Sequence, residues 1–255
     1  MKNFLVLNWK AGPETLEEAK KIVIAVRRIS KTAVRTAMVI CPPFIYLEPV
    51  SKMLLPRGKT LLGSQDVSST EGGPETGEVS AQMVRNIGAA FAIVGHSERR
   101  QLGETSELAA KKVNLAVRSG LFVVLCVGEP ERDSHGRFFR FLSEQLRLSL
   151  AKISRRQLPK IIIAYEPVFA IGKSEQEAMK APELRETVIF IRKVLADLFG
   201  QPAALAVPIL YGGSVGGSNA VTLFHDSGVQ GFLLGRASLK PADVSFVLKV
   251  VDPAP

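Results

Sequence analysis

The sequence has few of the features that mark secreted or membrane proteins. It contains only two cysteines among 255 residues, Cys41 and Cys126, and neither belongs to a metal-ligand spacing. We therefore expect two free thiols in a reducing compartment. The first ten residues, MKNFLVLNWK, show no cleavage site, and no segment reaches the roughly 18 apolar residues that a membrane helix needs. We expect a cytoplasmic protein that does not associate with membranes.

The chain also lacks any obvious division. No segment rich in Pro, Gly and Ser separates two halves, and no low-complexity tract occurs. With 46% hydrophobic and 22% charged residues, the composition is that of a globular protein with enough residues for a large core. Closed α/β barrels often have this length as one unit, so we expect residues 1–255 to form a single domain.

Acidic residues are the minority among the charges. Lys and Arg number 33 against 24 Asp and Glu, which gives a net charge of +9. Such an excess can indicate a nucleic-acid partner. However, the basic residues alternate with apolar ones in stretches such as KKIVIAVRRISK, which is typical of solvated outer faces of helices. We expect no nucleic-acid partner, and a positive field that helps to attract an anionic substrate.

Short apolar runs recur along the chain, separated by amphipathic stretches. Most runs are continuous rather than alternating, which indicates parallel strands that are covered on both faces. Strands are predicted over 3–8, 37–41, 59–64, 91–95, 121–127, 160–166, 207–213 and 231–235. Helices are predicted over 14–30, 44–54, 79–88, 105–119, 137–154, 182–199, 217–226 and 241–249.

This alternation favours an α/β fold of the (β/α)8 type, a single closed eight-stranded parallel barrel. An open doubly wound sheet is the alternative, which periodicity alone does not exclude. The longest turn-rich segment, 64–78, follows the third strand, and a loop of that size is usually functional or disordered. In parallel α/β proteins, ligands bind at the carboxyl ends of the strands, where most of the unusual residues of this chain fall.

Two of these strand ends carry basic or imidazole side chains. Side chains alternate along a strand, so Asn8 and Lys10 in LVLNWK point to one side and Trp9 to the other. We expect Asn8 and Lys10 to converge on the mouth of the barrel. His96 in IVGHSERR precedes a polar run that resembles the first turn of a helix. Because the positive end of a helix disfavours a second cation, we expect a neutral, hydrogen-bond-donating His96, with a surface histidine as the alternative.

The sixth predicted strand ends on a carboxylate, in IIIAYEPVFAIGKS. Pro167 restricts Glu166 to extended geometry, so Glu166 stays in line with its strand. The apolar residues that follow could cover the carboxylate and raise its pKa toward that of a working base. The GKS at 172–174 is no Walker A motif, because its first glycine would have to replace Pro167.

Glycine-rich turns follow the last two strands, in YGGSVGGSN and GFLLGRAS. Each leads from a strand toward a helix, where backbone N–H groups and the helix dipole bind phosphate. Phosphate sites built from these two loops recur in this type of barrel. The first turn lacks the G-x-G-x-x-G spacing of a dinucleotide site.

These fragments together resemble triosephosphate isomerase along nearly the whole chain. The matching segments are NWK (8–10), TGEVS (76–80), GHSERR (95–100), CVGE (126–129), AYEPV (164–168), AIG (170–172), YGGSV (211–215) and ASLKP (237–241). The resemblance implies a TIM barrel that interconverts dihydroxyacetone phosphate and D-glyceraldehyde 3-phosphate, in glycolysis and gluconeogenesis. The reaction passes through an enediolate and uses no metal or cofactor.

The resemblance also implies roles for individual residues. Glu166 would be the general base and His96 the neutral electrophile that polarises the carbonyl group. Lys10 would place positive charge beside the enediolate, and Asn8 would orient lysine and substrate. Other matches are the bracing residues Ser97 and Glu98, the phosphate-binding N–H groups of Gly172, Ser214, Gly235 and Arg236, and the apolar pair Ile171 and Leu233 of a lid over 167–179.

The long loop at 64–78 matches one that reaches into a neighbouring subunit of a homodimer. There Thr76 would approach the active site of the partner subunit. The chain departs from the family in having Phe169 where tryptophan is usual, a longer lid, Arg236 for a common glycine and Gln230 for a frequent aspartate. Two alternatives remain: a barrel isomerase or epimerase for another phosphosugar, and a catalytically idle barrel that binds a phosphorylated small molecule.

Overall fold

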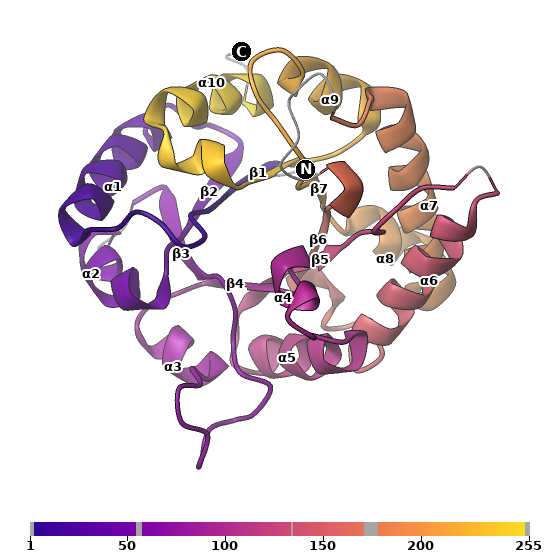
Figure 1. Cartoon of the computed structure of the whole chain (residues 1–255), viewed down its shortest axis with the longest axis horizontal. Coiled ribbons are helices and arrows are strands. Elements are labelled where there is room, and N and C mark those ends of the chain that lie inside the picture. The colour runs from indigo at the N-terminus through magenta and orange to yellow at the C-terminus, as the bar shows by residue number, and fades with distance from the viewer. Residues whose placement is uncertain (1–2, 55–57, 134, 171–177, 253–255) are drawn as a thin grey trace.

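The computed structural model describes residues 3–54, 58–133, 135–170 and 178–252. Its centre is a closed barrel of parallel strands in sequence order, surrounded by helices (Figure 1). The strands are β1 (Asn3–Asn8), β2 (Thr36–Cys41), β3 (Thr60–Ser64), β4 (Phe91–Val94), β5 (Phe122–Val127), β6 (Ile161–Tyr165), β7 (Ile209–Tyr211) and β8 (Gly231–Leu234).

Pairing between the first and last strands closes the barrel. Phe4 of β1 is in register with Gly231 of β8, and Leu7 with Leu234. The predicted (β/α)8 barrel is therefore confirmed, and the open doubly wound sheet is excluded.

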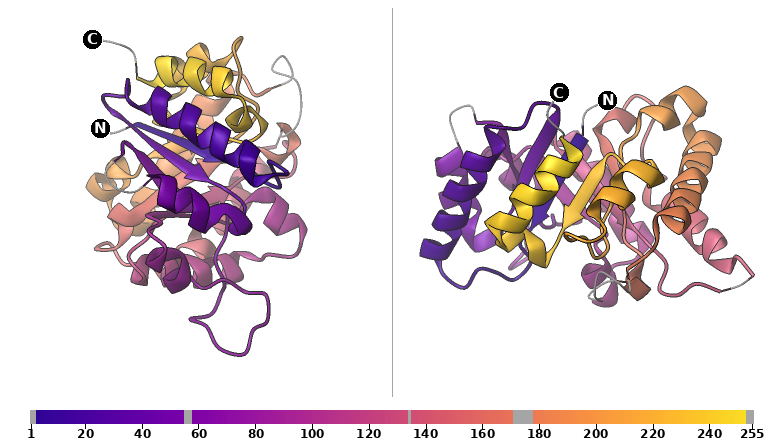
Figure 2. Two further views of the ribbon diagram at one scale, coloured as in Figure 1. Left: turned by 90° about the vertical axis from the view of Figure 1, so that its left-hand side faces the viewer. Right: turned by 90° about the horizontal axis from the view of Figure 1, so that it is seen from above.

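Helices cover the outside of the barrel, as the two further views in Figure 2 show. Their boundaries agree with the predicted ones within a few residues at most positions. The helices are α1 (Leu16–Ser30), α2 (Phe44–Leu54), α3 (Ala81–Asn86), α4 (Ser97–Gln101), α5 (Ser106–Arg118), α6 (Arg137–Ser149), α7 (Ala181–Phe199), α8 (Gln201–Ala206), α9 (Ala220–Ser227) and α10 (Pro241–Val251). Within the described ranges, no helix has the length and apolar character needed to cross a membrane.

The short helix α8 was not predicted. It follows α7 directly, with Gly200 at a φ of 85° between them. Pro202 lies in its first turn, where the missing N–H costs no helical hydrogen bond. A glycine followed two residues later by a proline therefore marks a helix start here, whereas periodicity indicates only a connection.

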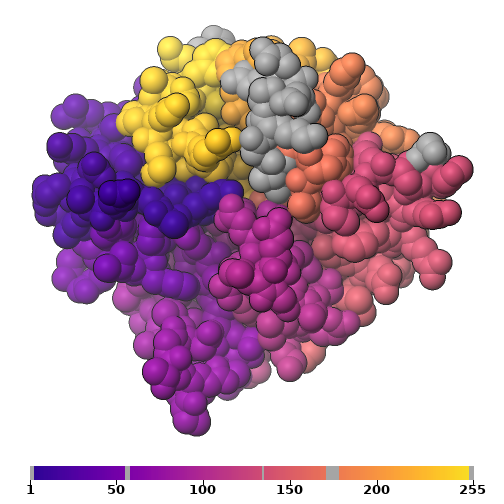
Figure 3. Space-filling view, viewed as in Figure 1, coloured from indigo at the N-terminus to yellow at the C-terminus, as the bar shows by residue number. Residues whose placement is uncertain are grey.

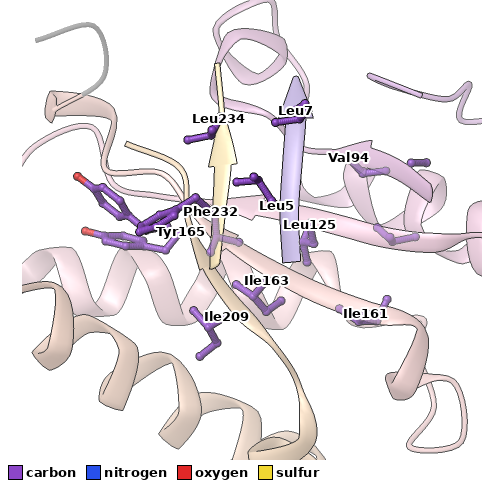
Figure 4. Close-up of a cluster of buried hydrophobic side chains, with 14 of the residues drawn as sticks. Leu5, Leu7, Val94, Leu125, Ile161, Ile163, Tyr165, Ile209, Phe232 and Leu234 are labelled. Atoms are coloured by element: carbon purple, nitrogen blue, oxygen red, sulfur yellow. The ribbon is translucent and has the colours of Figure 1, made fainter. Parts of the chain in front are cut away.

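Both faces of the strands are buried, as the continuous apolar runs predict. Leu5 and Leu7 of β1 belong to the larger hydrophobic cluster (Figure 4), which also includes Val23 of α1 and so lies between barrel and helices. The intervening Val6 belongs to a second cluster whose buried members all come from strands, Val39 among them. This second cluster is the interior of the barrel, which is packed with side chains below the strand ends.

Gln230 has a structural role that its sequence position does not reveal. Its Oε1 accepts the backbone N–H of Ile209 at 2.8 Å and Nη2 of Arg192 at 3.0 Å. Its Nε2 donates to the carbonyl of Gly228 at 2.8 Å. An amide supplies both an acceptor and a donor, whereas a carboxylate supplies acceptors only. Gln230 therefore ties the start of β7 to the turn before β8.

The segment 64–78 projects from the barrel between β3 and α3 (Figures 1 and 3). It is internally ordered, because Thr70 Oγ1 donates to Glu75 Oε2 at 2.6 Å and the N–H of Glu75 donates to the carbonyl of Gly73 at 2.8 Å. Arg118 of α5 anchors it through an ion pair with Glu71 at 2.9 Å. The loop thus has a defined conformation, stabilised by these hydrogen bonds and this ion pair.

Candidate active site

A cavity of about 740 Å³ opens at the carboxyl ends of the strands. Residues from the ends of β1, β4, β6, β7 and β8 line it, so segments far apart in the sequence meet there. Predicted site residues among its lining are Asn8, Lys10, His96, Glu98, Glu166, Ser214, Leu233, Gly235 and Arg236.

Lys10 reaches this cavity through an unusual backbone conformation. Its φ is 56°, in the left-handed region that side chains other than glycine enter at a cost. The side chain of Asn8 accepts the N–H of Lys10 at 3.0 Å and so supports that conformation. Lys10 Nζ is 2.5 Å from Glu98 Oε1. Trp9, which lies between Asn8 and Lys10 in the sequence, is buried in the core. A strained backbone thus holds a lysine ammonium group at the mouth of the barrel.

His96 caps the amino end of α4, and its ring is almost fully buried. Nδ1 accepts the backbone N–H of Glu98 at 3.2 Å, which requires a lone pair at Nδ1. Nε2 lies 3.1 Å from Glu166 Oε1. Burial lowers the pKa of His96, whereas the charge of Glu166 raises it, and on balance the pKa lies above its ordinary value. Because an imidazolium would direct a second N–H at that of Glu98, the geometry at Nδ1 favours the neutral tautomer with its proton on Nε2.

The Glu166 carboxylate is only 2% exposed, directly after β6. Its Oε1 faces His96, and its Oε2 accepts the backbone N–H of Ser97 at 3.1 Å. The N–H of Glu166 itself donates to the carbonyl of Val127 at 2.8 Å. The base candidate is therefore held both by its backbone and by its side chain.

The predicted rise in the pKa of Glu166 is wrong for this arrangement. Burial raises the pKa, but His96, the Ser97 N–H and the Cys126 thiol together lower it by more, so the net pKa lies below the ordinary value. The donors that outweigh burial come from other parts of the chain and cannot be seen in the segment around Glu166. The carboxylate is consequently ionised at neutral pH and ready to accept a proton.

The glycine-rich turns after β7 and β8 line part of the cavity. Residues 212–217 after β7 and 235–237 after β8 contribute to its wall. The β7 turn is shaped by Asn219, whose Oδ1 accepts the N–H of Gly216 at 3.0 Å and whose Nδ2 donates to the carbonyl of Ser214 at 3.1 Å. Arg236 and Lys240 add positive charge at the exposed edge of the same cavity. This wall suits an anionic group.

Three predicted residues do not lie among these groups. Ile171 and Gly172 fall outside the described residues, as does most of the predicted lid. Thr76 is exposed on the projecting loop 64–78 and does not line the cavity of its own chain. Its predicted contact with a partner subunit is taken up below.

Two glycines allow the backbone and side chain of Glu166 to sit where they do. A Cβ on Gly128 would lie 1.7 Å from the carbonyl oxygen of Glu166, and a Cβ on Gly212 would lie 2.7 Å from its Cγ. Both glycines occur in sequence segments that were noted for other reasons. Their role here depends on close approach between strands, which sequence spacing does not reveal.

A buried ionic network behind His96 was also missed. Glu104 accepts the N–H of Gly95, next to His96, at 2.9 Å, and it pairs with Lys112 Nζ at 2.5 Å. Lys112 also contacts Asp66 at 2.7 Å, although it is only 4% exposed. In the sequence, Lys112 resembles any solvated lysine of an outer helix. The network fixes the loop that carries the histidine.

The chain is similar to known proteins over nearly its whole length. The family model described as triosephosphate isomerase matches residues 3–252. A protein of Marinobacter nauticus named triosephosphate isomerase is 42% identical over 91% of this chain and 91% of its own length. Proteins with the same name from Dehalococcoides mccartyi strain 195 (40% identical, 91% of this chain and 90% of that protein) and Cytophaga hutchinsonii (36%, 97% and 98%) are also similar.

Proposed function

Because the chain belongs to the triosephosphate isomerase family, we propose that the cavity at the strand ends is its active site, with Glu166 as the catalytic base. The protein is an aldose-ketose isomerase of glycolysis that interconverts dihydroxyacetone phosphate and D-glyceraldehyde 3-phosphate. The roles of individual residues, the assembly and the cytoplasmic location are our proposals.

The contact between Glu166 and His96 carries the assignment. A neutral imidazole donor and an ionised carboxylate face each other across 3.1 Å, both nearly buried, at the wall of the cavity. A base and an acid within hydrogen-bond reach of one position are what proton abstraction next to a carbonyl group requires. A substrate that is to meet both groups must insert between them.

The proposed reaction then follows from these two groups. Glu166 removes a proton from the substrate carbon next to the carbonyl group, and the C–H electron pair forms the carbon–carbon double bond of an enediolate. His96 donates its Nε2 proton to the oxygen that gains charge and recovers a proton from the neighbouring hydroxyl. Glu166 returns its proton to the adjacent carbon, which completes the exchange of aldehyde and ketone.

Lys10 supplies the positive charge beside this intermediate. Its side chain lines the cavity, and its Nζ is paired with Glu98 at 2.5 Å. Preorganised charge at a developing oxyanion is worth several kcal/mol of barrier in typical enzymes. Asn8 serves this step indirectly, through the hydrogen bond that holds the strained backbone of Lys10.

The substrate phosphate is proposed to lie against the glycine turns. Ser214, Gly235 and Arg236 line the same cavity as Glu166, so their N–H groups would bind the phosphate, and Gly172 would add another from the lid. Leu233, which is 2% exposed and lines the same cavity, would contact the base from the apolar side together with Ile171. Backbone donors bind a dianion without placing a bulky cation beside it.

We further propose a homodimer. Large apolar side chains lie exposed on α2, on α3 and after α4: Ile45 at 79%, Leu102 at 77% and Met83 at 57%. A second cavity of about 330 Å³ adjoins them, lined by Asn8, Lys10 and Phe44. It would receive the loop of a second copy and bring the partner subunit's Thr76 to Asn8 and Lys10. Sedimentation velocity should give a dimer, and Ile45→Lys should favour the monomer.

The proposed roles are tested by isomerase activity on glyceraldehyde 3-phosphate in a coupled dehydrogenase assay. Glu166→Asp, which withdraws the carboxylate by one methylene, should lower kcat by a factor of about 100 or more. Glu144→Asp on the exposed face of α6 is the matched control and should keep full activity. A folded wild-type protein that binds inorganic phosphate without turnover would instead support the idle barrel.

A further inference from the structure

A second group of buried charges lies behind the active site, after β5. Glu129 is fully buried, and its Oε1 accepts Nε of Arg132 at 2.9 Å and the hydroxyl of Tyr165 at 2.7 Å. Among the described residues, no donor reaches its Oε2. A buried carboxylate is costly unless it is paired, so Arg132 is needed to keep this charge in place.

Arg132 connects three parts of the barrel. Besides Glu129, its Nη2 donates to the hydroxyl of Tyr165 at 3.2 Å and to Oγ1 of Thr187 on α7. Its guanidinium lies 4.4 Å from the centre of the Phe138 ring on α6. The flat, forked guanidinium makes these contacts in several directions at once, which a lysine ammonium cannot reproduce.

These contacts surround Tyr165, the residue directly before Glu166. Tyr165 is fully buried and is the last residue of β6. The N–H of Glu166 is bonded to Val127, and the N–H of Val168 is bonded to the carbonyl of Glu129 at 3.0 Å. The backbone on both sides of Glu166 is therefore bound to the segment 127–129, and Arg132 joins the side chains of Glu129 and Tyr165.

We propose that Arg132 is a positioning residue for the isomerisation: by holding Glu129 and Tyr165, it fixes the end of β6 and hence the carboxylate of Glu166. Arg132 does not line the main cavity, so it acts through these neighbours and not on the substrate. The inference rests on the proposed role of Glu166 as the base.

Phe169 lies near Arg132 as well. Its ring centre is 5.9 Å from the Arg132 guanidinium. A phenylalanine ring has no N–H group, so it cannot donate to the buried carboxylate. Arg132 supplies the charged donor from the β5 side, and the ring of Phe169 packs near its face. The arginine and the phenylalanine are thus parts of one arrangement at the root of the segment after Glu166.

The test is a series of full-length variants in the isomerase assay, with kcat and KM measured separately. Arg132→Met should lower kcat by a factor of about 10 to 100, because a displacement of about 1 Å at a catalytic group can cost that much. KM should change by less than about threefold, because the proposed phosphate contacts come from the turns after β7 and β8, which Arg132 does not contact through any hydrogen bond described above. Arg132→Lys should give a smaller loss. Tyr165→Phe, which keeps the ion pair and removes only the hydroxyl, should also lower kcat.

Arg192→Met is the matched control. Arg192 is also partly buried and bonded to Ala204, Val207 and Gln230, but it lies far from the cavity lining. It should lower the midpoint of thermal unfolding without lowering kcat. Wild-type kcat in folded Arg132→Lys and Tyr165→Phe would overturn the proposal, even if Arg132→Met fails to fold. Glu166→Asp in the same series separates the two claims, because full activity of that variant would refute the role of the base itself.

Discussion

The close approach of Gly212 to the side chain of Glu166 gives a sharp prediction for Gly212→Ala. The new methyl carbon would lie 2.7 Å from Glu166 Cγ, whereas ordinary contacts begin at 3.4 Å. Gly212 cannot easily retreat, since its N–H donates to the carbonyl of Tyr165 at 2.8 Å. The side chain of Glu166 must therefore shift by about 0.7 Å, away from His96 or out of line with it.

A displacement of this size at a catalytic group should lower kcat by a factor of about 10 to 100, or about 1.4 to 2.7 kcal/mol of barrier. Gly58→Ala is the control, because a Cβ there comes no closer than 3.6 Å to another atom and Gly58 does not line the cavity. The measurement is kcat for both variants in the coupled assay, with thermal unfolding to confirm that each is folded. A folded Gly212→Ala with the activity of Gly58→Ala would refute the assignment of Glu166 as a base whose position limits the rate.

Three further predictions concern charge. Lys112→Met should lower the free energy of unfolding by about 3–5 kcal/mol in denaturant titrations, because it removes the cation at 2.5 Å from buried Glu104 and leaves only Arg99 at 3.9 Å, and a loss below about 1 kcal/mol would contradict this. Lys10→Met should lower kcat by a factor of about 100 or more in a stably folded protein, and near-normal kcat would remove Lys10 from the mechanism. The free energy of unfolding should fall as the pH drops below 4.5, because the lowered folded pKa of Glu166 contributes stability above pH 4.5 that is lost as the pH falls through the folded pKa. A contribution of Glu166, measured against Glu166→Gln, that instead grows as the pH falls would show that burial dominates.

Most of the fold was predictable because both faces of each strand are buried. Continuous runs such as that of β6 have one face toward the helices and one toward the barrel interior, and so they stand out in sequence. Closure of the barrel depends on the pairing of β1 with β8, residues more than 200 positions apart, and only the structure shows it. Helix α8 was not predicted, because six residues are too few to show a helical periodicity.

The candidate site residues could be picked out from the sequence, but the pKa shifts and tertiary contacts around them could not. Asn8, Lys10, His96 and Glu166 stand out because polar residues end buried strands. The prediction of a neutral His96 rests on its position before a helix, and the Glu98 N–H directed at its Nδ1 agrees with it. The lowered pKa of Glu166 depends on donors from two other segments, 96–97 and Cys126, and the roles of Arg132 and Lys112 depend on tertiary contacts. Effects that depend on residues from several distant segments cannot be recognised in any one segment of the sequence.

The most direct test of the central claim is exchange of carbon-bound hydrogen with solvent. Dihydroxyacetone phosphate is incubated with the enzyme in D₂O, and the products are followed by NMR. If Glu166 carries a proton through an enediolate, deuterium should enter at carbon 2 of glyceraldehyde 3-phosphate, and a folded Glu166→Gln variant should abolish this incorporation. Isomerisation without any deuterium at carbon, or exchange at the wild-type rate in Glu166→Gln, would contradict the account.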